Sequence, residues 1–139
     1  MKSKGILCFA NNNSAIDYIK QAVYLAKRVK KYLDLPVSLV TSTFDKIDPM
    51  YHDCFDKIIR IQDDEKNSKR YYDGSQHLQL SFKNNGRLDS YDITPYDQTL
   101  ILDTDFIICN DKFKNAFNSK LPFQIYKKGT DLCHDRNLQ

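Results

Sequence analysis

"TLILDTDFIICND", residues 99–111, is one of the most apolar stretches of the chain, and two carboxylates, Asp103 and Asp105, interrupt it. A continuous apolar run bounded by turn residues is typical of an interior strand in a parallel sheet. We therefore expect a strand over residues 99–109 that continues past the two acids. "TPY", residues 94–96, predicts a turn just before it.

Upstream, short apolar runs alternate with one segment of helical periodicity. "GILCFA" predicts a buried strand that ends at the polar loop "NNNS". Ser14, with Asp17 three residues later, is a variant of the capping box that starts helices. We expect strands over residues 5–10, 37–41 and 57–61, and a helix over residues 14–33. This alternation predicts an α/β fold, a mainly parallel sheet with flanking helices, built as a single domain over residues 1–139.

Residues 62–93 carry a weaker pattern. The polar and charged stretch 62–74 predicts a surface loop or lid. "LQLSF", residues 78–82, alternates like a strand, whereas residues 82–93 favour a helix interrupted by Gly86. Basic and aromatic residues occur together over 66–72, but acidic residues surround them, so this segment does not indicate a nucleic-acid partner.

Composition points to a folded, water-soluble protein. The chain has 21 basic and 18 acidic residues, and both signs are interspersed, so the net charge of +3 does not suggest nucleic acid. The first apolar run is too short for a signal peptide, and no run approaches the length of a membrane span. We therefore expect a cytoplasmic protein without a membrane span.

The cysteines are widely spaced and form no CxxC pair, which predicts reduced, mostly structural thiols. They are Cys8, Cys54, Cys109 and Cys133. A zinc site assembled from His52, Cys54, Cys133 and His134 would match no compact ligand spacing.

The two acids lie where a ligand site is expected. In open α/β sheets, ligands bind beyond the carboxyl ends of the strands, and both "NNNS" and "DTD" occupy such ends. Carboxylates one residue apart in an extended chain point to opposite faces, so both reach one cation only if the backbone turns at Thr104 or if one acts through water or substrate. Oxygen ligands of this kind suit Mg²⁺ or Mn²⁺ carrying a diphosphate. The alternative is a strand-end turn and a helix cap, where aspartate is also common.

"RLDSYDITPYDQTLILDTDFII", residues 87–108, resembles the stretch of GT-A type glycosyltransferases in which "sPYdkTLyLDaD" leads into the metal-binding DxD motif. "CFANNNS", the long helix and "LPVSLVT" follow the same plan upstream, so the resemblance covers most of residues 5–111. These enzymes are nucleotide-diphospho-sugar transferases. The resemblance implies a minimal GT-A-like fold in which this chain is the nucleotide-sugar-binding half.

The same resemblance implies a set of site residues. Asp105, and Asp103 directly or through a water, would hold Mn²⁺ or Mg²⁺ on the phosphates of a UDP- or GDP-type sugar nucleotide. The implied donor-binding residues are Ala10 and Asn11 at the base or ribose, Thr41 in the same pocket, Arg87 at phosphate or sugar, and Thr104 between the acids. Arg87 also fits chemically, because a guanidinium pairs well with phosphate oxygens.

The chain departs from the family after the DxD motif. Only residues 106–139 come after Asp105, whereas GT-A enzymes usually have a longer segment that provides the acceptor site. Asp131, His134 and Asp135 are candidates for a late metal ligand or base. The expected function is metal-dependent glycosyl (hexosyl-type) transfer, and the alternatives are a non-catalytic sugar-nucleotide-binding module or a structural domain. An exposed sheet face would also favour a homo-oligomer.

Overall fold

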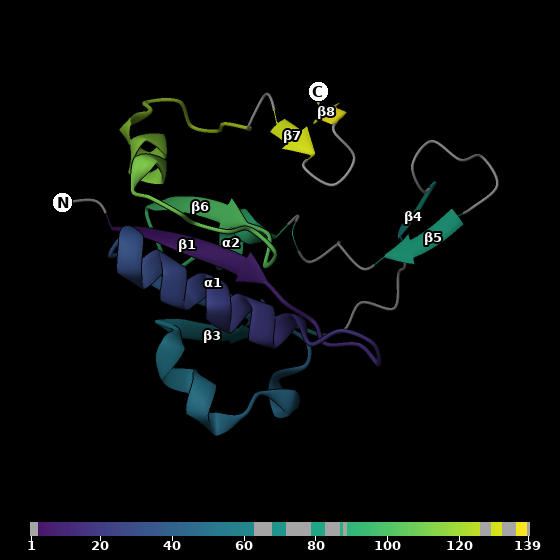
Figure 1. Ribbon diagram of the computed structural model, residues 1–139. Coiled ribbons are helices and arrows are strands. Elements are labelled where there is room, and N and C mark those ends of the chain that lie inside the picture. Colours follow the sequence, from purple (N-terminus) through teal and green to yellow (C-terminus); the bar gives the residue numbers. More distant parts are fainter. Residues whose placement is uncertain are drawn as a thin grey trace.

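The central element of the computed structural model is a four-stranded parallel sheet (Figure 1). The structure describes residues 3–62, 68–71, 79–82, 87, 89–125, 129–131 and 136–138. The strand order is β3-β2-β1-β6, and every neighbouring pair is parallel. The strands are β1 (Lys4–Phe9), β2 (Val37–Thr41), β3 (Lys57–Arg60) and β6 (Gln98–Leu102). The predicted α/β class with a parallel sheet is confirmed.

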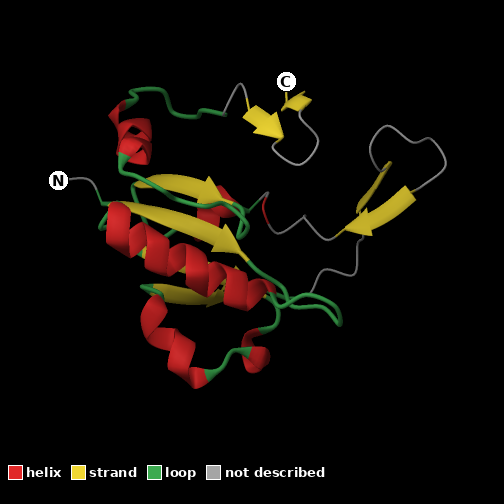
Figure 2. Cartoon of the chain, viewed as in Figure 1, coloured by secondary structure: helices red, strands yellow, loops and turns green. Residues whose placement is uncertain are grey.

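One long helix and several short elements accompany this sheet (Figure 2). Helix α1 (Tyr18–Tyr32) connects β1 to β2, and α2 (Ser90–Ile93) precedes β6. Two antiparallel pairs form separate small sheets, β4 (Ser68–Tyr71) with β5 (Gln79–Phe82) and β7 (Gly129–Asp131) with β8 (Arg136–Leu138). The 3₁₀ helices are η1 (Phe44–Lys46), η2 (Pro49–Cys54) and η5 (Lys112–Asn118).

One face of the sheet packs against α1. Ile19, Ala22, Leu25 and Val29 recur at helical spacing on this helix, and all are buried. They join alternate side chains of the central strands, such as Ile6 in β1, in one apolar cluster. The opposite face holds a smaller cluster of Leu7, Phe9 and Val40, against which Ile93 of α2 packs. Helical segments therefore lie on both faces of the sheet.

Tyr96 closes the amino-terminal part of that second face. Its ring covers Gly5, and its hydroxyl is 2.6 Å from Ser38 Oγ and donates to Asp56 Oδ2 at 3.3 Å. Burial raises the pKa of Tyr96 to about 12. Burial likewise raises the pKa of the Cys8 thiol to about 12, and this thiol contacts the Ser38 carbonyl oxygen. Both groups therefore stay neutral in the folded protein.

Helix α1 begins four residues later than the sequence predicts. Asn13 Oδ1 accepts hydrogen bonds from the backbone N–H groups of Ala15 and Ile16, which holds this stretch in a turn. Asp17 is the cap instead of Ser14, and its Oδ1 accepts from the Lys20 backbone N–H at 2.9 Å. A local side-chain turn thus prevents the first predicted helical turn from forming.

The Asp17 cap predicts a measurable pH dependence of stability. The hydrogen bond from the Lys20 backbone lowers the pKa of Asp17 in the folded protein. Its stabilising contribution is therefore complete above the unfolded pKa of about 3.9 and is lost as pH falls through the lower folded value. Asp17→Ala should lower the free energy of unfolding by about 1 kcal/mol at pH 7. Asp17→Asn should keep the cap, but its free energy of unfolding in urea should fall less steeply than that of the wild type as the pH drops through the acid range. The same dependence of unfolding free energy on acid pH in the wild type and in Asp17→Asn would contradict this.

Strand β6 ends earlier than expected. It stops at Leu102, and the chain turns at once, because the Phe106 backbone N–H donates to the Asp103 carbonyl at 3.1 Å. Ile108 is then fully buried in the α1-side core, which draws the chain away from the sheet. The predicted continuation of the strand to residue 109 is therefore wrong.

Two further predictions need correction. Residues 68–71 of the expected loop 62–74 form strand β4, which pairs with β5; residues 63–67 and 72–74 lie outside the described residues. Of the helix expected over residues 82–93, the described residues show α2, while Phe82 belongs to β5; residues 83–86 and 88 lie outside the described part. No helix among the described residues is long and apolar enough to cross a membrane.

Candidate functional site

The strand order creates a topological switch point between β1 and β6. The chain moves outward from β1 through β2 to β3 and then returns to the other side of β1. β1 and β6 are paired up to Cys8 and Leu102, so their carboxyl ends lie side by side. Ligands of open α/β sheets bind in the crevice at such a point. The asparagine loop after β1 and the aspartate turn after β6 therefore begin at adjacent strand ends.

The backbone bends between the two carboxylates of the aspartate turn. The bend occupies Asp103 to Phe106, with Thr104 and Asp105 at its centre. Thr104 is 8% exposed, and its hydroxyl donates to Gln21 Oε1 on α1 at 3.1 Å. Thr104 therefore anchors the turn to the helix, while Asp103 and Asp105 remain exposed.

Asp103 already has a cationic partner. Arg87 forms an ion pair with Asp103 Oδ1, and its guanidinium carbon lies 5.9 Å from the centroid of the Phe9 ring. The Asp103 side chain is 56% exposed, so solvent also screens its charge. A cation is thus not needed to offset burial of this carboxylate. The structure brings Arg87 to the aspartate turn, as a phosphate-binding role would require.

The asparagine loop is fixed to the neighbouring elements. Asn11 Oδ1 accepts from the Ser42 backbone N–H at 2.7 Å, which joins the ends of β1 and β2. Asn12 Oδ1 accepts from the Ile19 N–H, and Asn12 Nδ2 donates to Asp17 Oδ1 at 2.8 Å. The small side chain of Ala10 is buried at the last position before this loop. The loop is therefore held in place before any ligand binds.

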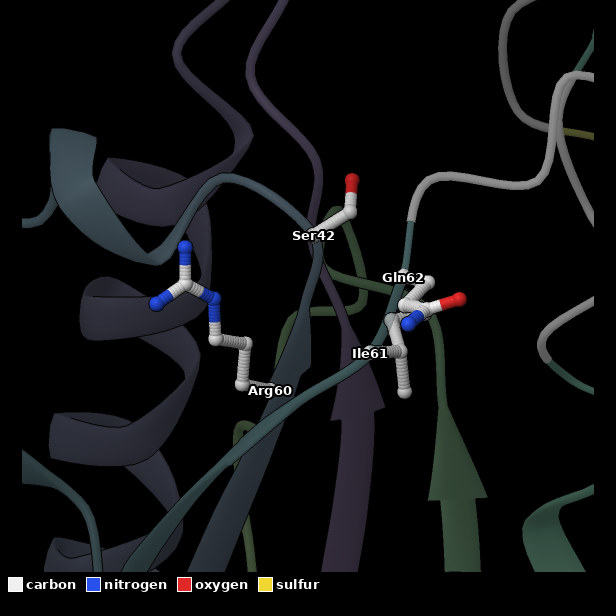
Figure 3. A pocket seen from close by; sticks show the side chains of 4 residues that line it. All are labelled: Ser42, Arg60, Ile61 and Gln62. Atoms are coloured by element: carbon white, nitrogen blue, oxygen red, sulfur yellow. The ribbon is translucent and has the colours of Figure 1, made fainter.

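A hollow of about 390 Å³ lies beyond the carboxyl ends of β2 and β3 (Figure 3). This volume is at the lower end of what small-molecule sites use. Thr41, the residue before Ser42, is fully buried and does not line the hollow; its hydroxyl is 3.1 Å from Thr43 Oγ1. Arg60 is held by an ion pair with Asp45 at 2.9 Å. The lining residues are Ser42, Arg60, Ile61 and Gln62.

A second hollow of about 380 Å³ lies beside Asp105, between α1 and the chain that follows β6. It is lined by aromatic and aliphatic side chains together with charged ones: Asp17, Lys20, Gln21, Tyr24, Thr104, Asp105, Phe106 and Ile107. Asp103 does not line it. The two acids of the motif therefore face different surroundings, one toward Arg87 and the other toward α1.

The two aspartates can bind a cation only if other ligands, such as the phosphates of a bound nucleotide, complete its coordination. Within the described residues, no three His, Cys, Asp or Glu side chains lie close enough to hold a metal ion. Two exposed aspartates fit Mg²⁺ or Mn²⁺ only when a bound diphosphate completes the coordination. Cys133, His134 and Asp135 lie outside the described residues, and only the backbone of Asp131 is described. The zinc alternative and the late-ligand candidates therefore stay untested.

Sequence reasoning missed the residues that line the hollow at β2 and β3. Ser42 directly follows β2, and Arg60 is the last residue of β3. The rule that ligands bind beyond the carboxyl ends of strands would have selected both, because both strands were predicted. Protein-family models, curated proteins and solved structures were also compared with this chain, and none of them matches it.

Proposed function

We propose that this chain is a metal-dependent, GT-A type glycosyltransferase that binds a nucleotide-diphosphate sugar at the carboxyl edge of its sheet. The observation that carries the proposal is the switch point, where the asparagine loop and the Asp103–Asp105 turn follow the adjacent ends of β1 and β6. The sequence resemblance over residues 87–108 supplies the reaction class. The ion pair that brings Arg87 to the turn adds a phosphate-binding group at the same place.

Each group has a role consistent with its surroundings. A divalent cation bound with the donor would stabilise the negative charge that develops on the leaving nucleoside diphosphate. Asp105 would supply one oxygen ligand, and Asp103 would supply its Oδ2, because Oδ1 is paired with Arg87. Arg87 would share its guanidinium with a phosphate oxygen. Ser42, Gln62 and Arg60 would contact the nucleoside from the hollow beside them.

Thermal unfolding against nucleoside diphosphates and sugar nucleotides, each with and without Mn²⁺, tests the proposal. A ligand that binds only the folded state should add about 2.7 kcal/mol at 100 times its dissociation constant. We expect a Mn²⁺-dependent stabilisation by one donor, and we expect Asp105→Ala to abolish it, because the remaining aspartate is engaged by Arg87. Asp53→Ala removes an exposed carboxylate in η2 and serves as the matched control.

The outcomes separate the candidate functions. Stabilisation that Asp105→Ala removes, together with release of nucleoside diphosphate from the donor, supports a transferase. The same stabilisation without any release would identify a non-catalytic sugar-nucleotide-binding module. If no nucleotide stabilises the protein with or without Mn²⁺, the proposal fails and the aspartate turn is structural.

A further inference from the structure

Helix α1 is strongly basic, whereas the rest of the chain has slightly more acidic than basic residues. Its 15 residues include five basic side chains and no acidic one, whereas the whole protein has a net charge of only +3. The basic residues are Lys20, Lys27, Arg28, Lys30 and Lys31. Lys30 is paired with Asp34 at 2.6 Å, which offsets its charge. The remaining four make α1 a strongly cationic helix.

Three of these lysines form one stripe. At about 3.6 residues per turn, Lys20, Tyr24, Lys27 and Lys31 fall within an arc of about 60° on the helix surface. All four are exposed, on the side opposite the buried residues that pack on the sheet. Tyr24 is 53% exposed and interrupts the stripe of charge with an aromatic ring.

The chain after β6 adds apolar side chains to this stripe. Phe106 is 39% exposed and Ile107 is 60% exposed, and both line the hollow shared with Lys20 and Tyr24. They are held there because Arg28 Nε donates to the Ile108 carbonyl at 2.7 Å. The Thr104 bond to Gln21 fixes the preceding turn, and Figure 1 shows the chain running back along the sheet after β6.

We propose that this surface, which consists of Lys20, Tyr24, Lys27, Lys31, Phe106 and Ile107, binds an anionic lipid bilayer. Lysines near a bilayer are attracted to acidic headgroups, and exposed aromatic and aliphatic side chains insert at the interface. A nucleic-acid duplex bound through its phosphates would use the lysines but gains little from exposed Phe106 and Ile107, so the apolar part favours lipid. The proposal does not depend on nucleotide binding.

Two acidic residues lie at one end of this surface and bound its cationic part there. Asp17 and Asp105 line the hollow at the end of the stripe closest to the sheet edge. Asp17 accepts hydrogen bonds from the Lys20 backbone and from Asn12. The cationic part therefore extends from Lys20 toward Lys31, away from Asp105. Contact with lipid along this part would leave the aspartate turn at the margin of the interface.

Flotation of the full chain with vesicles tests the proposal. We expect binding to phosphatidylcholine vesicles that contain about 30% phosphatidylglycerol, and none to pure phosphatidylcholine. Lys27→Glu/Lys31→Glu should weaken this binding by more than about tenfold, since each lysine near the surface contributes to the attraction. Lys46→Glu/Lys57→Glu makes the same change of net charge at exposed positions away from α1 and should retain binding.

A second pair of variants tests the apolar part. Tyr24→Ser/Ile107→Ser should weaken vesicle binding several-fold while leaving its salt dependence intact. Far-UV circular dichroism and thermal unfolding of every variant exclude loss of fold as the cause. Equal binding to neutral vesicles would overturn the proposal, and so would an equal loss of binding in the Lys46/Lys57 control. The proposal would also be overturned if the Tyr24/Ile107 variant kept its affinity for vesicles and the protein bound an oligonucleotide tightly.

Discussion

Replacing Gly5 with alanine is expected to destabilise the protein by about 2–3 kcal/mol, because a Cβ at this position would overlap the Tyr96 ring. The ring is part of the second face of the sheet and has little room to withdraw. Moving it also pulls the Tyr96 hydroxyl away from Ser38 and Asp56. Ser38 is fully buried, so the loss of its partner adds a desolvation cost.

A double-mutant cycle separates the clash from other effects. Tyr96→Ala alone should be strongly destabilising, because it removes a large buried ring. In that background the Cβ of Gly5→Ala has room, so the second substitution should add less than about 0.5 kcal/mol. Free energies of urea unfolding for the four proteins give the coupling directly. If the two substitutions were additive, contact between Gly5 and Tyr96 would not explain the cost.

Leu25→Ala is expected to cost about 2–5 kcal/mol, since Leu25 is fully buried where α1 packs on the sheet. The neighbouring Tyr24→Ala is the matched control on the same helix. Tyr24 is 53% exposed, and its replacement should change the free energy of unfolding by no more than about 0.5 kcal/mol. Equilibrium urea denaturation of both variants measures the difference.

The packing of Leu25 beneath α1 also bears on the candidate site. Because α1 holds Thr104 through Gln21, loss of packing under α1 should also loosen the aspartate turn. Any Mn²⁺-dependent nucleotide binding should therefore weaken in Leu25→Ala more than in Tyr24→Ala. Equal stability of the two variants would show that α1 contributes little to the core.

Local pattern in the sequence predicted the parallel strands well. "ILCF" and "VSLVT" are mainly apolar or β-branched, and "KIIR" has two isoleucines at its centre; each forms a strand within one residue of its predicted bounds. The runs in β1 and β2 are buried on both faces of the sheet, so their environment is encoded in their own residues, whereas β3 lies at the sheet edge and its isoleucines are half-buried. The position of the asparagine loop and of the aspartate motif at strand ends followed from the same pattern.

The sequence did not predict where β6 stops or where α1 starts. Both boundaries depend on competition between local hydrogen bonds and regular structure, such as the Asn13 turn before α1. The strand was predicted to continue past the two acids because apolar residues follow them, but in the folded protein these residues do not pair as a strand. Ile108 is drawn into the core beneath α1, whereas Phe106 and Ile107 stay exposed.

The sequence by itself therefore determined the α/β class, the parallel strands and the acids available at their ends, because these depend on short-range pattern. Only the tertiary structure decided that β6 returns beside β1, that Arg87 pairs with Asp103, and that Ser42 and Arg60 border one hollow. The lipid-facing surface proposed for α1 likewise depends on Phe106 and Ile107 lining the same hollow as Tyr24. These relations join residues far apart in the chain, and their geometry arises from packing that no local pattern contains.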